Sequence, residues 1–236
     1  MTREFTRLEN WSGRVGNFLI GSLIVAIPFE LYQIYRARTD ANPFSVENYF
    51  LLGITVITLL LFVAVRWISK RLYYQLPITF EVAILIFIYL TLYVGDGHLI
   101  YWRYGWYDVV AHGLAGVALG FVGFLMLYIA MIRQKVLLPA FYAGLFAFSF
   151  SVMIGVLWEF FETFMDAYFG TTMVKGSGYD DIIGDLLGDT VGALFASVIG
   201  YLYVKGKEVA LFGTMMDYFI ELNQAKLDGD EPAREN

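Results

Sequence analysis

Six long apolar stretches constrain the fold of this chain more than any other feature of its sequence. About 20 mainly apolar residues cross a bilayer as a helix, and short polar or turn-forming segments separate the stretches here. The stretches cover residues 15–35, 49–66, 78–99, 108–131, 137–166 and 182–204. We therefore predict an all-α fold: a polytopic membrane helical bundle with six transmembrane helices, in a single domain over residues 1–205.

The composition supports a membrane protein and excludes several other classes. Charged residues make up 16% of the chain, whereas soluble domains carry about 25%. The chain contains no cysteine, which excludes disulfides and thiolate chemistry. A net charge of −6 without a basic patch argues against nucleic acid as a partner. We expect the first apolar stretch to act as an uncleaved anchor, because the polar residues before it do not resemble a signal peptide.

The positions of the basic residues predict the orientation of the chain in the membrane. If the N-terminus is cytoplasmic, twelve of the 16 Lys and Arg residues fall on the cytoplasmic side. Cytoplasmic loops of membrane proteins carry such an excess of positive charge. We therefore predict a multi-pass protein of a prokaryotic inner (cytoplasmic) membrane, with both termini in the cytoplasm.

Residues 206–236 are predicted to form a cytoplasmic amphipathic helix followed by a polar tail. Leu211, Met215, Phe219 and Leu222 recur at helical spacing. The helix would lie on the inner membrane surface or pack on the protein's own cytoplasmic face. The last residues are polar and acidic, and we expect them to be disordered.

Four ionisable residues lie inside the last three apolar stretches, beyond the first helical turn. A carboxylate at the centre of a membrane helix costs roughly 2.5–3.5 kcal/mol, so such residues face protein, bind a cation or share protons. With the predicted orientation, all four fall in the outer half of the membrane. We therefore predict one outward-facing site formed by His112, Glu159, Asp185 and Asp189. A hydrogen-bonded network without a ligand is the alternative.

Further acidic residues share the predicted helix faces of this set, at spacings of three or four residues. They are Asp108, Glu162, Asp166 and Asp181, which we regard as additional candidates for the site. Two of them also have simpler interpretations. Asp108 stands where an N-cap belongs, and Asp166 fits an interfacial carboxylate.

Glycines recur every four residues on two of these stretches. Gly184, Gly188 and Gly192 form one row beside the aspartates, and Gly116 with Gly120 forms another. Small residues at this spacing let membrane helices pack closely. We therefore expect carboxylates of neighbouring helices to come within reach of a shared ligand.

Several carboxylates with one imidazole form an oxygen-rich site that suits a divalent metal ion. Mg²⁺, Ca²⁺ and Mn²⁺ prefer oxygen ligands, and Zn²⁺ would bind through His112. Protons shared between the carboxyl groups are the alternative to a metal. The sequence contains no nucleophile motif of the GxSxG or HExxH type, and we predict no organic cofactor.

A family pattern covers roughly residues 100–205. Its residues are Trp106, Tyr107, Asp108, His112, Trp158, Glu159, Glu162, Asp166, Asp181, Asp185, Asp189 and Gly192. The pattern resembles the YjdF-type inner-membrane proteins. It is similar, more distantly, to the VanZ-like family with its Asp-x3-His, Glu-x2-Gln and Asp-x3-Asn-x2-Gly elements.

The resemblance implies the helical fold and the clustering of these side chains, but it implies no activity. The YjdF-type family has no assigned activity, and the VanZ-like link to glycopeptide-antibiotic resistance is unexplained chemically. Two residues depart from the VanZ-like pattern: Glu162 stands in place of Gln, and Asp189 stands in place of Asn. Both changes add negative charge, which favours a cation over a neutral hydrogen-bond network.

Three functions are compatible with such a site, and the sequence does not decide whether the protein is an enzyme. The first is a binding or accessory protein whose site holds a divalent cation or an envelope-lipid headgroup. The second is a metal-dependent membrane enzyme acting on a lipid-linked phosphate or ester, with one carboxylate as general base. The third is a structural subunit of a larger membrane complex. The expected partners are membrane lipids and another membrane protein.

Overall fold

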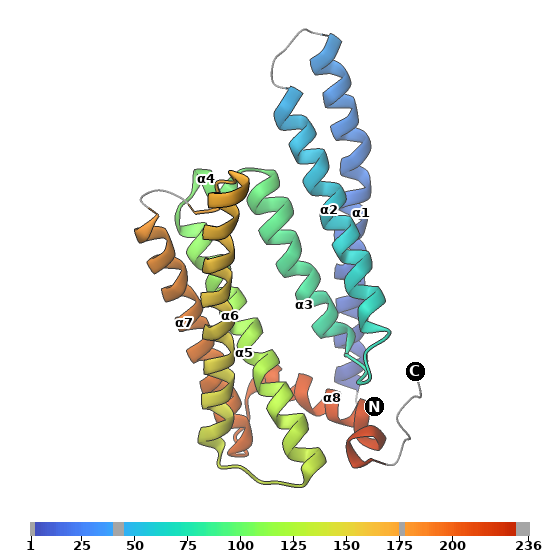
Figure 1. Cartoon of the computed structure of the whole chain (residues 1–236). Coiled ribbons are helices and arrows are strands. Elements are labelled where there is room, and N and C mark those ends of the chain that lie inside the picture. Colours follow the sequence, from blue (N-terminus) through green and yellow to red (C-terminus); the bar gives the residue numbers. More distant parts are fainter. Residues whose placement is uncertain (1–2, 40–44, 175–177, 230–236) are drawn as a thin grey trace. The chain divides into compact units, whose positions relative to one another are not determined.

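The computed structural model describes residues 3–39, 45–174 and 178–229, and every regular element in these ranges is a helix (Figure 1). The helices are α1 (Arg3–Thr39), α2 (Ser45–Ser69), α3 (Ile78–Ile88), the π-helix η1 (Tyr89–Gly97), α4 (Ile100–Arg103), α5 (Trp106–Gln134), α6 (Ala140–Phe169), α7 (Tyr179–Val204) and α8 (Ala210–Asp228). Six helical segments in these ranges are long and apolar enough to cross a membrane. The prediction of an all-α polytopic membrane protein is confirmed.

The helices begin at residues that hydropathy alone does not locate. The fifth predicted stretch begins at residue 137, whereas α6 begins at Ala140, directly after Pro139. Proline has a fixed φ and no backbone N–H, so it suits the start of a helix. The sixth stretch is predicted from residue 182, whereas α7 already begins at Tyr179. Acidic residues occupy the first turn of α7, where the helix dipole favours negative charge.

The chain divides into two compact units. The N-terminal unit runs to Tyr104 and includes Glu221–Asn223, and the C-terminal unit contains Gly105–Ile220 and the residues after Asn223. All residues of the predicted site belong to the C-terminal unit. The prediction of a single membrane domain over residues 1–205 stays a prediction.

An apolar core lies between α1, α2 and α3 of the N-terminal unit. Leu23, Phe62 and Leu85 are fully buried in it. The unit also buries an acid, Glu30, whose Oε1 accepts a 2.8 Å hydrogen bond from the Thr55 hydroxyl. This bond offsets part of the cost of burying a polar group among apolar side chains.

In the C-terminal unit, α5, α6 and α7 pack on one another, and α8 adds to their core. The core contains Phe124 of α5 and Ala143 of α6, and α8 contributes Phe212 and Met216. Phe212 stacks on Phe121 with ring centroids 4.3 Å apart. The start of α8 is therefore held against the three long helices of its own unit.

The predicted helix thus forms as α8, and residues outside the predicted apolar row contribute to its buried face. Leu211 is 59% exposed, whereas Phe212 and Met216 are buried. Of the four residues in that row, Phe219 is buried. The cytoplasmic location of this helix stays a prediction, and the polar tail over residues 230–236 lies outside the described residues.

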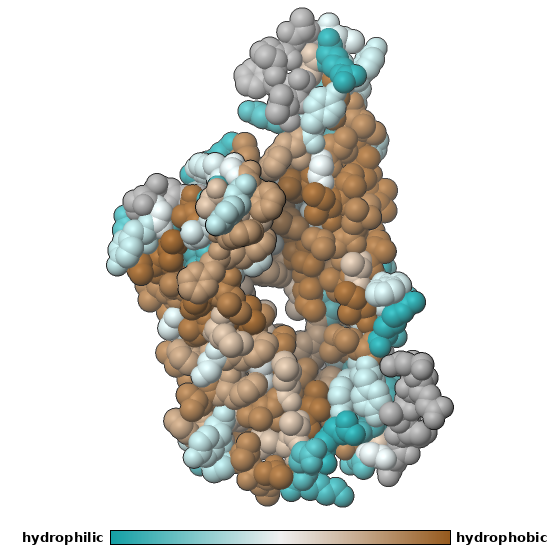
Figure 2. Space-filling model, viewed as in Figure 1, coloured by the Kyte–Doolittle hydropathy of each residue, from teal (hydrophilic) through white to brown (hydrophobic). Residues whose placement is uncertain are grey.

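Apolar side chains cover much of the visible surface along the helices, and hydrophilic ones gather near the helix ends (Figure 2). Large apolar side chains are exposed on helices of both units, among them Phe18 and Leu60 in the N-terminal unit and Leu187 and Val191 on α7. In water such a surface would be unfavourable, whereas lipid acyl chains solvate it. The long helices therefore present a surface that contacts membrane lipids.

Candidate functional site

Close packing of α5 against α7 positions the polar residues of these two helices. A Cβ atom on Gly192 would overlap the carbonyl oxygen of Gly113, and one on Gly116 would overlap the carbonyl oxygen of Asp189. Gly188 makes a backbone contact of the same kind. Only glycine leaves room for such an approach. The close packing predicted from the glycine rows is confirmed at these positions.

The third helix, α6, approaches the same pair through two small residues. A Cβ on Gly155 would overlap the carboxylate of Asp189. The hydroxyl of Ser151 donates a 2.8 Å hydrogen bond to the carbonyl oxygen of Gly116. Neither residue was predicted as part of the site, although both lie on the helix face of Glu159, which they precede by four and eight residues.

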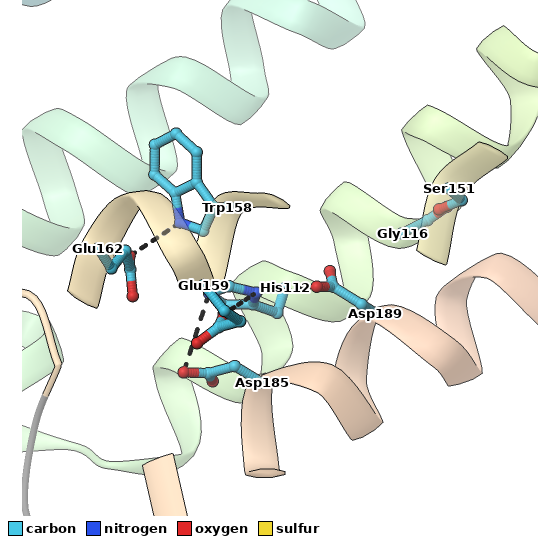
Figure 3. A network of polar contacts seen from close by, with 8 residues as sticks. All are labelled: His112, Gly116, Ser151, Trp158, Glu159, Glu162, Asp185 and Asp189. Carbon is cyan, nitrogen blue, oxygen red and sulfur yellow. Dashed lines mark hydrogen bonds and ion pairs between the residues drawn. The ribbon is translucent and has the colours of Figure 1, made fainter. Parts of the chain in front are cut away.

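Three carboxylates from two helices surround the imidazole of His112, which lies on α5 (Figure 3). Its Nδ1 lies 3.3 Å from Oδ2 of Asp189 and 3.8 Å from Oε1 of Glu159. Its Nε2 lies 3.9 Å from Oδ2 of Asp185. The four residues predicted as a shared site therefore come together, and we refer to them with Asp108 as the carboxylate–histidine cluster.

Asp108 joins the cluster from the first turn of α5. One ligand atom each from Asp108, His112 and Asp185 lies within 4.8 Å of the others. The simpler interpretation of Asp108 as an N-cap is wrong, because Gly105 precedes the helix and α5 has no side-chain cap. The side chain is only 8% exposed, so it faces the protein rather than solvent.

The cluster is closed to solvent, and several of its oxygens lack partners. Glu159 is 4% exposed, Asp185 is 2% exposed and His112 is 9% exposed. Within the part of the chain that the structure describes, neither carboxylate oxygen of Glu159 has a hydrogen-bond partner, nor does Oδ1 of Asp185. Buried polar atoms are normally hydrogen-bonded, so these atoms require an explanation.

Glu162 is buried one turn beyond Glu159 and has a partner of its own. Its Oε1 accepts a 2.8 Å hydrogen bond from the indole Nε1–H of Trp158, four residues earlier on α6 (Figure 3). This contact explains how a membrane helix tolerates the second acid. Trp158 is a residue of the site region whose role the sequence did not indicate.

The two remaining candidates lie outside the groups of close ligand atoms found among the described residues. Asp166 accepts hydrogen bonds from the backbone N–H groups of Met173 (2.8 Å) and Val174 (2.9 Å). It therefore holds the segment that follows α6, which gives it a structural role. Asp181 is half-buried in the first turn of α7, one turn before Asp185.

These observations define a polytopic helical membrane protein with a buried carboxylate–histidine cluster on three of its membrane-spanning helices. A family model for a predicted membrane protein (DUF2238) matches residues 18–206, and the chain belongs to this family. The match includes every residue of the cluster. Comparison with curated proteins and with solved structures found no match, and the more distant VanZ-like resemblance stays a prediction.

Proposed function

We propose that this protein is a multi-pass inner-membrane protein that binds a divalent cation through His112, Glu159, Asp185 and Asp189. The unpartnered oxygens of Glu159 and Asp185 carry this proposal. An isolated buried carboxylate is strongly unfavourable, whereas one that coordinates a metal is a common arrangement. A cation at the cluster would bind the oxygens that accept no hydrogen bond from the described residues.

The donor set also fits such an ion. Carboxylate oxygens suit Mg²⁺, Ca²⁺ and Mn²⁺, and the imidazole of His112 extends the range to Zn²⁺. Carboxylate oxygens and a ring nitrogen already converge, since Asp108, His112 and Asp185 each offer one ligand atom within 4.8 Å of the others, and Glu159 and Asp189 offer oxygens that also lie within 4.8 Å of each other.

The alternative functions have less support. A metal-dependent enzyme acting on a lipid-linked phosphate or ester needs an open coordination position, and a bound envelope-lipid headgroup needs comparable access. The cluster residues are at most 9% exposed, which favours binding of a metal ion alone over binding of a larger substrate or headgroup. A purely structural subunit would have a fully paired network, which the unpartnered oxygens of Glu159 and Asp185 argue against.

An outward-facing cluster in the inner membrane is part of this proposal. The start of α5, the end of α6 and the start of α7 lie at one end of the C-terminal unit (Figure 1). The opposite end carries Arg133, Lys135, Lys205 and Lys207. Positive charge favours the cytoplasmic side, and the resemblance to YjdF-type inner-membrane proteins agrees with this location.

Metal-dependent thermal unfolding of the full chain in detergent tests the proposal. After chelation, one of Mg²⁺, Ca²⁺, Mn²⁺ or Zn²⁺ is expected to raise the melting temperature of the wild type. A ligand at 100 times its Kd stabilises by about 2.7 kcal/mol, and each kcal/mol corresponds to roughly 2–4 °C in a chain of this size. The Asp185→Asn, Asp189→Asn double variant should show no such rise. Equal shifts in both proteins, or none in the wild type, would overturn the proposal.

A further inference from the structure

The two ring nitrogens of His112 face different carboxylates. Nδ1 faces Asp189 and Glu159, whereas Nε2 faces Asp185 (Figure 3). The close ligand atoms accordingly form two groups that share only this histidine. One group is His112 with Glu159 and Asp189, and the other is His112 with Asp108 and Asp185.

Each group contains a side chain that lacks a full set of partners. On the Nδ1 side, both oxygens of Glu159 are without a hydrogen bond from any described residue. On the Nε2 side, the same holds for Oδ1 of Asp185. Both side chains are more than nine-tenths buried and point toward His112. A single ion on one side of the ring could bind only the carboxylate on that side. The carboxylate on the other side would still have a buried oxygen without a hydrogen bond.

We propose that the cluster holds two divalent cations, one on each side of the His112 ring; this inference rests on the proposed function. Charge supports it, because two such ions balance the formal charge of the four carboxylates Asp108, Glu159, Asp185 and Asp189. One ion would balance only two of these four formal charges, which lie on side chains that are at most 8% exposed. Burying charge without compensation is strongly unfavourable.

The chemistry of the imidazole assigns a different role to each nitrogen. A neutral imidazole has one N–H and one lone pair. Nδ1–H is within reach of Oδ2 of Asp189, at 3.3 Å, and this tautomer leaves the lone pair on Nε2. Histidines that bind metals commonly donate their other N–H to a carboxylate. One cation therefore takes Nε2 with Asp108 and Asp185, and the other takes the carboxylates of Glu159 and Asp189.

Titration of the metal-depleted full chain with Mn²⁺ alone, followed by electron paramagnetic resonance, counts the ions and reports their proximity. The wild type is expected to bind two Mn²⁺ per chain, and their bound spectrum should show spin coupling between neighbouring ions. Asp108→Asn and Glu159→Gln should each reduce the count from two to one and abolish the coupling. Asp180→Asn, the same charge change at an exposed position of α7, is the control and should retain two.

The outcomes separate this inference from the proposed function on which it rests. One Mn²⁺ per wild-type chain would overturn the two-ion inference and leave the proposed function standing. No bound Mn²⁺, together with no binding of Mg²⁺, Ca²⁺ or Zn²⁺, would remove both. Two uncoupled ions in the wild type, or two ions in every variant, would also contradict the inference. The wild-type spectrum decides the question even if a variant fails to fold.

Discussion

Replacing Gly192 with alanine is expected to destabilise the protein strongly, whereas the same change at Gly113 should be tolerated. A Cβ on Gly192 would overlap the carbonyl oxygen of Gly113, which belongs to the backbone of a neighbouring helix and cannot rotate away. Overpacking in well-packed cores costs about 1–3 kcal/mol and occasionally more, and we expect the upper end or beyond. Thermal unfolding in detergent should then show a melting temperature lower by roughly 6–12 °C.

Gly113→Ala is the matched control, because Gly113 lies on α5 at the same contact between α5 and α7. A Cβ there would meet only the carbonyl oxygen of Gly188, at 3.6 Å, which is an ordinary contact distance. Alanine also favours a helix over glycine by about 1 kcal/mol, so the variant should be unchanged or slightly more stable. Similar melting temperatures for Gly192→Ala and the wild type would contradict the backbone packing of α5 on α7.

Replacing Glu159 with glutamine is expected to change stability in opposite directions with and without metal. In the metal-free protein, Glu159 is a buried acid, and neither of its carboxylate oxygens accepts a hydrogen bond from a described residue. Glutamine has nearly the same shape and no charge, so the variant should be more stable by about 1–3 kcal/mol. In the metal-loaded protein the variant lacks a ligand and should be the less stable of the two.

The measurement is the melting temperature of both proteins in excess chelator and in saturating metal. Glu162→Gln is the control: it makes the same substitution one turn further along α6, on a residue that accepts a hydrogen bond from Trp158. A glutamine carbonyl can still accept that bond, so little change is expected in either condition. If Glu159→Gln shifts stability in the same direction in both, Glu159 is not a metal ligand.

Most of the fold could be predicted from the sequence because a bilayer imposes simple rules. A spanning segment must be long, apolar and hydrogen-bonded within itself, so hydropathy locates most of the long helices to within a few residues. The exception is α1, which begins at Arg3, twelve residues before the predicted stretch starts at residue 15. The exact ends depend on local chemistry, such as Pro139 before α6 and the acidic first turn of α7. The buried face of α8 was harder to predict, because Leu211 and Phe212 are equally apolar neighbours and only packing distinguishes them.

The core of the candidate site could also be predicted, because His112, Glu159, Asp185 and Asp189 are too deep in apolar helices for solvation. Its periphery could not be. Asp166 sits on the same helix face as Glu159, yet it binds the loop after α6, and spacing alone does not show where a loop folds back. Gly155 shares the helix face of Glu159, but its contact with Asp189 depends on how closely α6 packs on α7.

Elemental analysis of the purified wild type beside the Asp185→Asn, Asp189→Asn double variant tests the central claim most directly. Both proteins would be purified in the same buffers, so that adventitious metal affects them equally. The account predicts a stoichiometric divalent metal in the wild type, at least one ion per chain, and its loss in the variant. The absence of metal from both proteins, with the same thermal stability in each, would contradict the claim that this cluster is a metal site.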